Sequence, residues 1–351
     1  MKITVLAGGL SPERDVSLTT GVMAAQALRS QGHQVAVVDL FLGVEQPIED
    51  MEQFFAQGGS VHQAGVARQA PDLLALKRQR RDKSPSRLGC QVLDICRSAD
   101  IVFIGLHGAD GENGYVQALL DLVGVKYTGS GPLGSGLAMD KAAAKLMFQA
   151  AGLRTPAGQL IKRPETAAAD AELPQELPLP CFVKPLHGGS SVATTLVEWA
   201  EDLPAALSAV FACQDDALVE PYIKGREIQV GILGRQALPP IEIVCENSFF
   251  DYVMKYQAGA CREICPAAVA PEVAAQLQAA ALTAFNCLGL QVYSRADFIV
   301  DEQNRPWLLE INTLPGMTAT SLVPQEAAVL GLSYAGLCQR IIDLSLDKYR
   351  D

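Results

Sequence analysis

The chain has 351 residues, of which 49% are hydrophobic and 19% charged, and its formal net charge is −11. This length allows two or three domains with a substantial core. The negative net charge argues against a broad binding surface for nucleic acid or an anionic membrane, so a few placed cations must hold any anionic ligand.

No apolar run approaches the ~20 residues that span a bilayer, and the N-terminus shows no signal-peptide pattern. The nine cysteines are scattered, odd in number and without the paired spacing of a zinc site. We therefore expect a cytoplasmic protein whose cysteines are reduced thiols.

The first elements are predicted to be a strand, a glycine-rich loop, a helix and a second strand. An apolar run at 2–7 leads through AGGLSPERD into a helix-periodic segment, and QVAVVDL at 34–40 follows. Such a loop often cradles a phosphate, because backbone N–H groups at a helix start favour an anion. Here the loop carries Glu13 and Asp15, which suit a phosphate poorly, so its ligand is an open question.

A third strand at 100–106, a helix at 115–124 and a short strand at 125–131 complete a doubly wound unit. The interval 57–90 is polar, basic and poor in periodicity, which favours a solvated insertion over a binding patch.

Beyond this unit, the pattern changes to a helix at 139–153, two strands joined by LHGG, and period-two strands from residue 217. We expect an α/β domain at 1–129, followed by α+β domains at 130–216 and 217–351.

The most informative stretch is SRADFIVDEQNRPWLLEINT at 294–313, which is predicted to form a hairpin. Glu310 and Asn312 lie two apart on one strand and so share a face, and Asp297 falls opposite Glu310 if the turn closes symmetrically. Two carboxylates and an amide oxygen suit Mg²⁺. The alternative is a solvated hairpin face, but the apolar residues around both carboxylates favour a metal site.

A second element is glycine-rich. Lys184 ends an apolar strand before a loop with Ser190 and Ser191, whose backbone N–H groups and hydroxyls could cover phosphate oxygens. Lys141 and Lys255 are further candidate cations, although a single lysine is more often a surface residue. With the hairpin they predict a nucleotide triphosphate site that is not a P-loop, since no GxxxxGK[ST] occurs.

A third element is ALVEPYIKGREIQVGIL at 217–233, in which Glu220 ends one strand and Glu227 lies on the next. These carboxylates and the strand backbone could bind adenine and ribose, or either glutamate could cap an exposed edge.

Together these motifs resemble the D-alanine–D-alanine ligase family of the ATP-grasp superfamily, from residue 1 to about 345. The resemblance implies an ATP-grasp fold: an N-terminal doubly wound parallel-sheet domain followed by two α+β lobes that enclose ATP. It is carried by GGLSPERDVSLTTG, LHGADGENGYVQALLDLVGVKYTGSG, AMDKAAAKLM, VKPLHGGSSVA, VEPYIKGREIQV, FFDYVMKY, SRADF and LEINTLPGMTATSLVP.

The resemblance implies roles on the substrate side. Glu13 would bind the α-ammonium of the first D-alanine, which explains an acidic loop. Arg295 and the backbone N–H of Gly316 would stabilise the oxyanion of the tetrahedral intermediate. The other implied substrate residues are His107, Glu112, Lys255, Ser321 and Leu322, with Glu13, Ser190 and Tyr256 as a hydrogen-bonded triad.

It also implies roles on the nucleotide side. ATP phosphates would meet Lys141, Lys184, Ser191 and Lys255, while adenine and ribose would be held at Glu220, Pro221, Ile223 and Glu227. Two Mg²⁺, which Mn²⁺ can replace, would be coordinated by Asp297, Glu310 and Asn312. The segment 246–262 would form a lid, because an acyl phosphate must be protected from water.

The implied reaction is ATP-dependent ligation of two D-alanines through an acyl phosphate, for peptidoglycan precursor synthesis, by a homodimer that binds neither nucleic acid nor membrane. A D-alanine–D-serine or other D-amino-acid ligase is the alternative, although Lys255 and Tyr256 favour an amine as second substrate. A nicotinamide-dependent oxidoreductase fits poorly because GxGxxG is missing. A catalytically dead nucleotide-binding regulator is disfavoured by the intact hairpin. One departure from the family is Ala193, where many members have glycine.

Overall fold

The computed structural model describes residues 1–63, 65, 71–165, 177–189, 192–245 and 261–350. Four predicted site residues, Ser190, Ser191, Lys255 and Tyr256, lie outside the described residues, as does most of the predicted lid.

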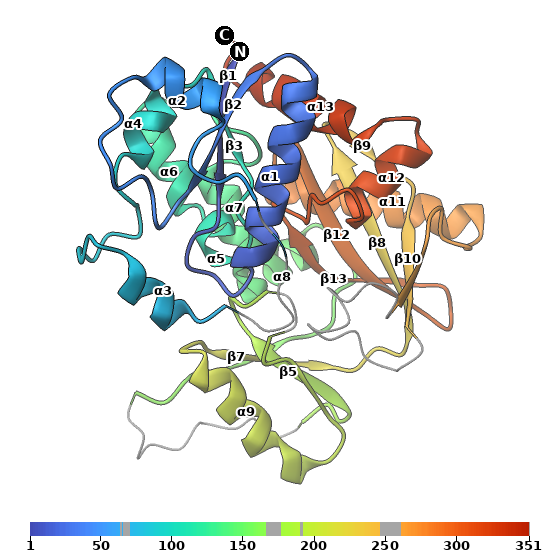
Figure 1. Ribbon diagram of the computed structural model, residues 1–351. Coiled ribbons are helices and arrows are strands. Elements are labelled where there is room, and N and C mark those ends of the chain that lie inside the picture. The colour runs from blue at the N-terminus through green and yellow to red at the C-terminus, as the bar shows by residue number, and fades with distance from the viewer. Residues whose placement is uncertain (64, 66–70, 166–176, 190–191, 246–260, 351) are drawn as a thin grey trace.

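The N-terminal part is built on a parallel sheet of order β2-β1-β3 (Figure 1). Strands β1 (Lys2–Ala7), β2 (Gln34–Asp39) and β3 (Ile101–Ile104) are almost wholly buried, as expected for apolar runs covered on both faces. Helix α1 (Arg14–Ser30) joins β1 to β2 and lies so close to β1 that a Cβ at Gly21 would stand 2.6 Å from the Cβ of Ala7. The predicted parallel-sheet unit is confirmed, except that the short strand predicted at 125–131 is only an isolated bridge between Val102 and Tyr127.

Five short helices complete this part. They are α2 (Met51–Gln57), α3 (Leu73–Gln79), α4 (Val92–Arg97), α5 (Ala109–Glu112) and α6 (Tyr115–Leu122). Helix α3 has no buried residue, whereas Arg80 directly after it is buried against the Phe41 ring; the solvated insertion at 57–90 stays a prediction.

Two helices lead to the next sheet: α7 (Pro132–Met139) and α8 (Lys141–Ala150). Helix α8 begins at Lys141 rather than at 139, because the Asp140 side chain caps it by accepting from Ala143 N at 2.9 Å.

The second sheet is antiparallel with order β4-β7-β5-β6. Its strands are β4 (Gln159–Ile161), β5 (Cys181–Pro185), β6 (Thr195–Val197) and β7 (Ala217–Pro221). Helix α9 (Leu203–Ala212) packs against β5, β6 and β7 at the bottom of Figure 1. The short 3₁₀ helix η1 (Ala200–Asp202) contacts α9. The domain boundaries at 129 and 216 stay predictions.

The third sheet is antiparallel with order β11-β10-β8-β12-β13, and β9 pairs with β8. Its strands are β8 (Gly225–Leu233), β9 (Gln236–Ala237), β10 (Ile241–Cys245), β11 (Cys261–Ile264), β12 (Tyr293–Asp301) and β13 (Pro306–Asn312). The period-two strands expected from the sequence are confirmed.

The side chains of β8 point alternately to the two faces of the third sheet, and this determines which residues can face a ligand. Ile228, Val230 and Ile232 point into the core that includes helix α11 (Pro271–Cys287), so Glu227 and Gly231 belong to the opposite face. Helix α12 (Leu322–Val329) also contacts β8, and α13 (Tyr334–Asp347) packs against α1.

The expectation that the cysteines are reduced thiols is wrong for one pair. Cys245 and Cys261 form a disulfide, because the β10–β11 register places them directly opposite each other with Cα atoms 4.3 Å apart. The sequence did not indicate this pair, because fifteen residues separate the two cysteines and this spacing belongs to no recognised pattern.

Within the described ranges, no single helix is long and apolar enough to cross a membrane. Taken together, α12 and α13 are long and apolar enough, but the two helices are bent by 98° relative to each other. Both pack on neighbouring elements of the fold.

Candidate functional site

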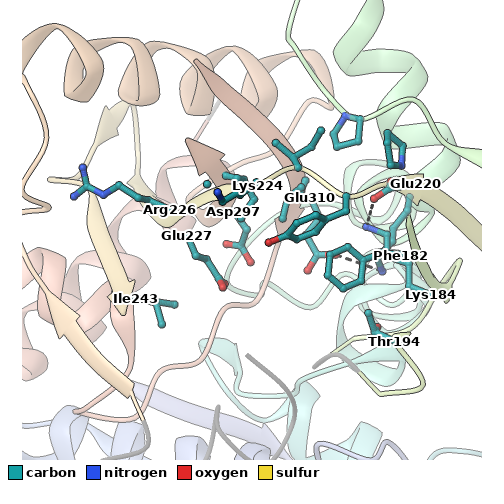
Figure 2. A pocket seen from close by; sticks show the side chains of 18 of the residues that line it. Phe182, Lys184, Thr194, Glu220, Lys224, Arg226, Glu227, Ile243, Asp297 and Glu310 are labelled. Carbon is teal, nitrogen blue, oxygen red and sulfur yellow. Dashed lines mark ion pairs between the residues drawn. The ribbon is translucent and has the colours of Figure 1, made fainter. Parts of the chain in front are cut away.

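A cavity of 520 Å³ lies between the second and third sheets (Figure 2). Its walls come from β5 and β7 on one side and from β8, β10, β12 and β13 on the other. It gathers eight of the residues predicted from sequence for nucleotide or metal: Lys141, Lys184, Glu220, Pro221, Ile223, Glu227, Asp297 and Glu310.

One end of the cavity holds a buried cluster of two lysines and a glutamate. Lys184 and Lys145 lie 2.7 Å and 2.6 Å from the two carboxylate oxygens of Glu220. Burial alone would raise the pKa of Glu220, but the two lysines lower it; burial lowers the pKa of Lys145 to about 8. The cluster thus keeps a net positive charge next to the space where anionic oxygens could lie.

Lys145 was missed in the sequence, although a signal existed. It lies four residues after Lys141 on α8, so the two lysines share one helix face. Lys145 also donates to Thr155 Oγ1 at 2.8 Å and Pro156 O at 3.2 Å, which fixes its position beside Glu220.

The predicted hairpin forms as expected. Asp297 and Glu310 are directly opposed in the β12–β13 register, and Arg295 is opposed to Asn312. Arg295 donates twice to Asp297, from Nε to Oδ1 and from Nη2 to Oδ2, both at 2.7 Å, and Asn312 Nδ2 donates to Asp297 Oδ2 at 3.1 Å. Lys141 Nζ lies 3.5 Å from Glu310 Oε2, which brings a candidate phosphate cation to the hairpin.

The hairpin fits a magnesium ion held partly by a ligand. In the described part of the chain no three His, Cys, Asp or Glu side chains converge to hold a metal alone. Mg²⁺, however, is usually bound by one or two carboxylates plus substrate phosphates. The opposed carboxylates of Asp297 and Glu310, with the Asn312 amide oxygen beside them, provide that donor set.

The cavity is also lined by two aromatic rings, next to Lys184 and Glu220, and by an ion pair that the sequence did not reveal. Phe182 and Tyr222 meet edge to face with ring centroids 5.7 Å apart, a surface suited to a flat base. Arg226 forms a double hydrogen bond with Glu242 at 2.7 Å and 2.6 Å. Figure 2 shows Glu227 in the same wall; its carboxylate accepts from Gln229 Nε2 at 3.3 Å.

Glu13 lies at the start of α1, between two glycines from distant segments. A Cβ at Gly108 would stand 2.5 Å from Glu13 Oε2, and one at Gly189 would stand 3.2 Å from it. Gly108 also has φ +71°, a conformation that favours glycine. The acidic loop is therefore brought against the glycine loop that follows β5, at the side of the phosphate lysines.

His107 and Glu112 join the first domain to the end of β13. His107 Nδ1 donates to Leu314 O at 2.9 Å, so Nε2 of the neutral ring accepts from Thr20 Oγ1 at 2.8 Å. Burial lowers the pKa of His107. Glu112 accepts from Gly108 N at 3.0 Å and Leu314 N at 3.3 Å. Their roles toward a substrate stay predictions, but their contacts orient the loop that bears Gly108.

We expect Glu112→Gln to change how stability depends on pH. Burial, reinforced by the charge of Glu13, raises the pKa of Glu112 from 4.5 to about 8. Between these values the native state binds more protons than the unfolded state, so this group's contribution to the free energy of unfolding falls as pH rises. The free energy of unfolding, measured by urea denaturation at pH 5, 7 and 9, should therefore become larger for Glu112→Gln than for the parent as the pH approaches 9. The exposed Glu49→Gln should show no such trend; parallel profiles for Glu112→Gln and the parent would contradict this prediction.

The loop after β13 brings two further predicted residues together. Ser321 is the residue before α12, and its Oγ accepts from Thr318 N at 3.0 Å. A Cβ at Gly316 would stand 3.0 Å from the same Oγ. Gly316, Ser321 and Leu322 thus form one short segment.

Ala193, the departure from the family pattern, has φ +54°. This is the left-handed conformation that glycine adopts more readily, which gives a physical reason for the glycine found in many members.

A parallel-sheet domain followed by two antiparallel sheets, with lysines and opposed carboxylates in the cavity between them, defines an ATP-grasp protein. The chain belongs, more particularly, to the D-alanine–D-alanine ligase family. The family model for the D-ala D-ala ligase N-terminus matches residues 2–130, and that for the D-ala D-ala ligase C-terminus matches residues 147–343. The fold and family predicted from the sequence are confirmed.

Relatives agree over the whole length. The D-alanine–D-alanine ligase of Nitratidesulfovibrio vulgaris is 42% identical and aligns over 99% of this chain and 98% of its own. That of Lacticaseibacillus casei is 39% identical over 100% and 97%. Among solved structures, the Bacillus anthracis ligase complexed with ATP has a TM-score of 0.74 at 27% identity, covering 99% and 98% of the two chains. The Coxiella burnetii ligase has 0.73 at 26%, covering 99% and 94%.

Proposed function

We propose that the protein joins two D-alanines to D-alanyl-D-alanine with ATP, through an acyl phosphate, as a step in making peptidoglycan precursors. The observation that carries the proposal is the register of Asp297 opposite Glu310, with Lys141 and Lys184 in the same cavity. Membership of the D-alanine–D-alanine ligase family supports this choice of substrate.

The first step makes a carboxylate electrophilic. Glu13 holds the ammonium of the first D-alanine, and the carboxylate of that alanine attacks the γ-phosphorus, which releases ADP. Lys141 and Lys184 neutralise charge on the transferring group. Asp297, Glu310 and Asn312 are the residues that would hold Mg²⁺, which supplies further charge neutralisation at the phosphates.

The second step forms the peptide bond. The neutral amine of the second D-alanine attacks the acyl carbon, the carbon–oxygen bond to phosphate breaks, and the proton lost by the amine leaves with the released phosphate. Arg295 and the Gly316 N–H stabilise the oxyanion, while Ser321 receives the carboxylate of the second alanine. Water must be kept out because it would hydrolyse the acyl phosphate.

The test is phosphate release from Mg·ATP by the purified protein with D-alanine alone, and with D-serine, D-lactate or L-alanine added, with products identified by mass. D-Alanine alone should give the dipeptide and one phosphate per peptide bond. Release that needs a different acceptor would correct the second substrate to D-serine or another amino acid. No stimulation by any D-amino acid would refute the ligase assignment.

We also propose that the protein acts in the cytoplasm as a homodimer. Helices α6 and α7 are in contact and carry large apolar side chains that are exposed: Tyr115 at 74%, Leu122 at 86% and Leu133 at 76%. Burial of such a patch against a second copy would be favourable. Sedimentation should give a dimer for the parent and a monomer for the double variant Leu122→Glu, Leu133→Glu. A monomeric parent would disprove the dimer, and a dimeric double variant would place its interface elsewhere.

A further inference from the structure

Beside Arg295, the third sheet has a position without a side chain. Gly231 on β8 is the register partner of Arg295 on β12. Directly opposed residues of an antiparallel pair extend to the same face. The glycine therefore leaves a space next to the Arg295 side chain, on the face that also carries Asp297.

A carboxyl group from another element fills this space. Glu326 on α12 is fully buried, and its Oε1 accepts from Gly231 N at 2.8 Å. A Cβ at Gly231 would stand 2.5 Å from Glu326 Oε2. The carboxyl group of Glu326 thus takes the place of a side chain at 231, adjacent to Arg295.

Stability alone does not explain this glutamate. Its Oε2 is buried and has no hydrogen-bond partner in the part of the chain that the structure describes. Burial raises the pKa of Glu326 well above its ordinary value. Burying a carboxyl group with one unpaired oxygen costs free energy of folding. The hydrogen bond from Gly231 N to Glu326, however, links α12 to β8.

The helix held in this way begins at the predicted site for the second D-alanine. Ser321 is the residue immediately before α12, and Leu322 is the first residue of the helix. Glu326 lies a little more than one turn further along. A shift of α12 against β8 would therefore move Ser321 relative to Arg295.

We propose that Glu326 is a positioning residue, which fixes α12, and with it Ser321, relative to the Arg295 guanidinium. This inference rests on the proposed function, in which these two residues act on the second D-alanine and the oxyanion. Glu326 is absent from the wall of the nucleotide cavity, so its loss should affect the second alanine and not ATP.

The test compares Glu326→Gln, which keeps an acceptor for Gly231 N–H, with Glu326→Leu, which removes it. Gly231→Ala provides an independent variant, because its methyl group displaces the carboxyl group. Leaving a buried N–H unpaired corresponds to ~10-fold in an equilibrium. The KM for the second D-alanine should therefore rise ~10-fold in Glu326→Leu and Gly231→Ala, with KM for ATP and for the first D-alanine within about twofold; Glu326→Gln should stay close to the parent.

The parent protein is assayed first. If it forms no dipeptide, the proposed function fails, and this inference with it. If it does, an unchanged KM for the second D-alanine in Glu326→Leu, or an equal rise for ATP, would show that Glu326 does not position the acceptor site. If Glu326→Leu does not fold, the same KM values are compared between Gly231→Ala and Glu326→Gln. An unchanged KM for the second D-alanine in Gly231→Ala would then contradict the positioning role.

Discussion

Glu310→Gln is expected to lower the rate of D-alanine-dependent phosphate release by ~10³-fold, the upper range for loss of one preorganised electrostatic contact. Glutamine keeps the shape of the side chain but removes one of the two opposed charges of the hairpin. Glu310 lies directly opposite Asp297 and within 3.5 Å of Lys141 Nζ. The substitution therefore weakens the proposed metal site and leaves Lys141 without its nearest carboxylate. Steady-state phosphate release over a range of Mg²⁺ concentrations measures the loss.

Glu302→Gln is the matched control for this prediction. Glu302 lies in the turn of the same hairpin, where it pairs with Lys224 at 2.9 Å and both side chains are exposed. Exposed pairs contribute little, so this variant should turn over at the parent rate. Equal activity of Glu310→Gln and the parent, with both folded, would remove Glu310 from the site and leave the metal assignment without its main support.

The hairpin shows how much of this site the sequence could predict. Asp297 and Glu310 can be placed opposite each other from the length of two strands and one turn, because a strand has a fixed period of two. The structure has this register, with an irregularity only between Asp297 and Phe298. Local periodicity also gave the first βαβ unit and the antiparallel strands after residue 217.

Contacts between distant segments could not be predicted in the same way. Glu326 reaches Gly231 across 95 positions, and the pairing of Phe182 with Tyr222 depends on how two strands are joined. The Cys245–Cys261 disulfide depends on the register of β10 with β11. None of these leaves a periodic or spaced pattern, so each appears only once the sheets are assembled. Lys145 is different, because its spacing of four from Lys141 was visible.

Arg295→Lys is expected to lower kcat by ~10²-fold while KM for ATP stays within about twofold. Burial works against the charge of Arg295, but Asp297 outweighs it and raises the pKa, so the loss cannot come from deprotonation of the native arginine. Its guanidinium is held by two parallel hydrogen bonds to Asp297. An ammonium keeps the charge but not this planar fork, so its position toward the oxyanion is lost. Rapid-quench measurement of ADP and dipeptide separates the two steps.

The separation of steps decides what Arg295 does. If Arg295 acts on the oxyanion, ADP should still form in a first turnover while dipeptide formation slows, because only the second step creates a tetrahedral centre at the acyl carbon. Arg305→Lys provides the control, since Arg305 pairs with Asp301 at 2.7 Å at the far end of β12 and is about half exposed. Slowing of ADP formation to the same degree as dipeptide formation would instead assign Arg295 to phosphoryl transfer, through its hold on Asp297, and the oxyanion role would pass to the Gly316 N–H alone.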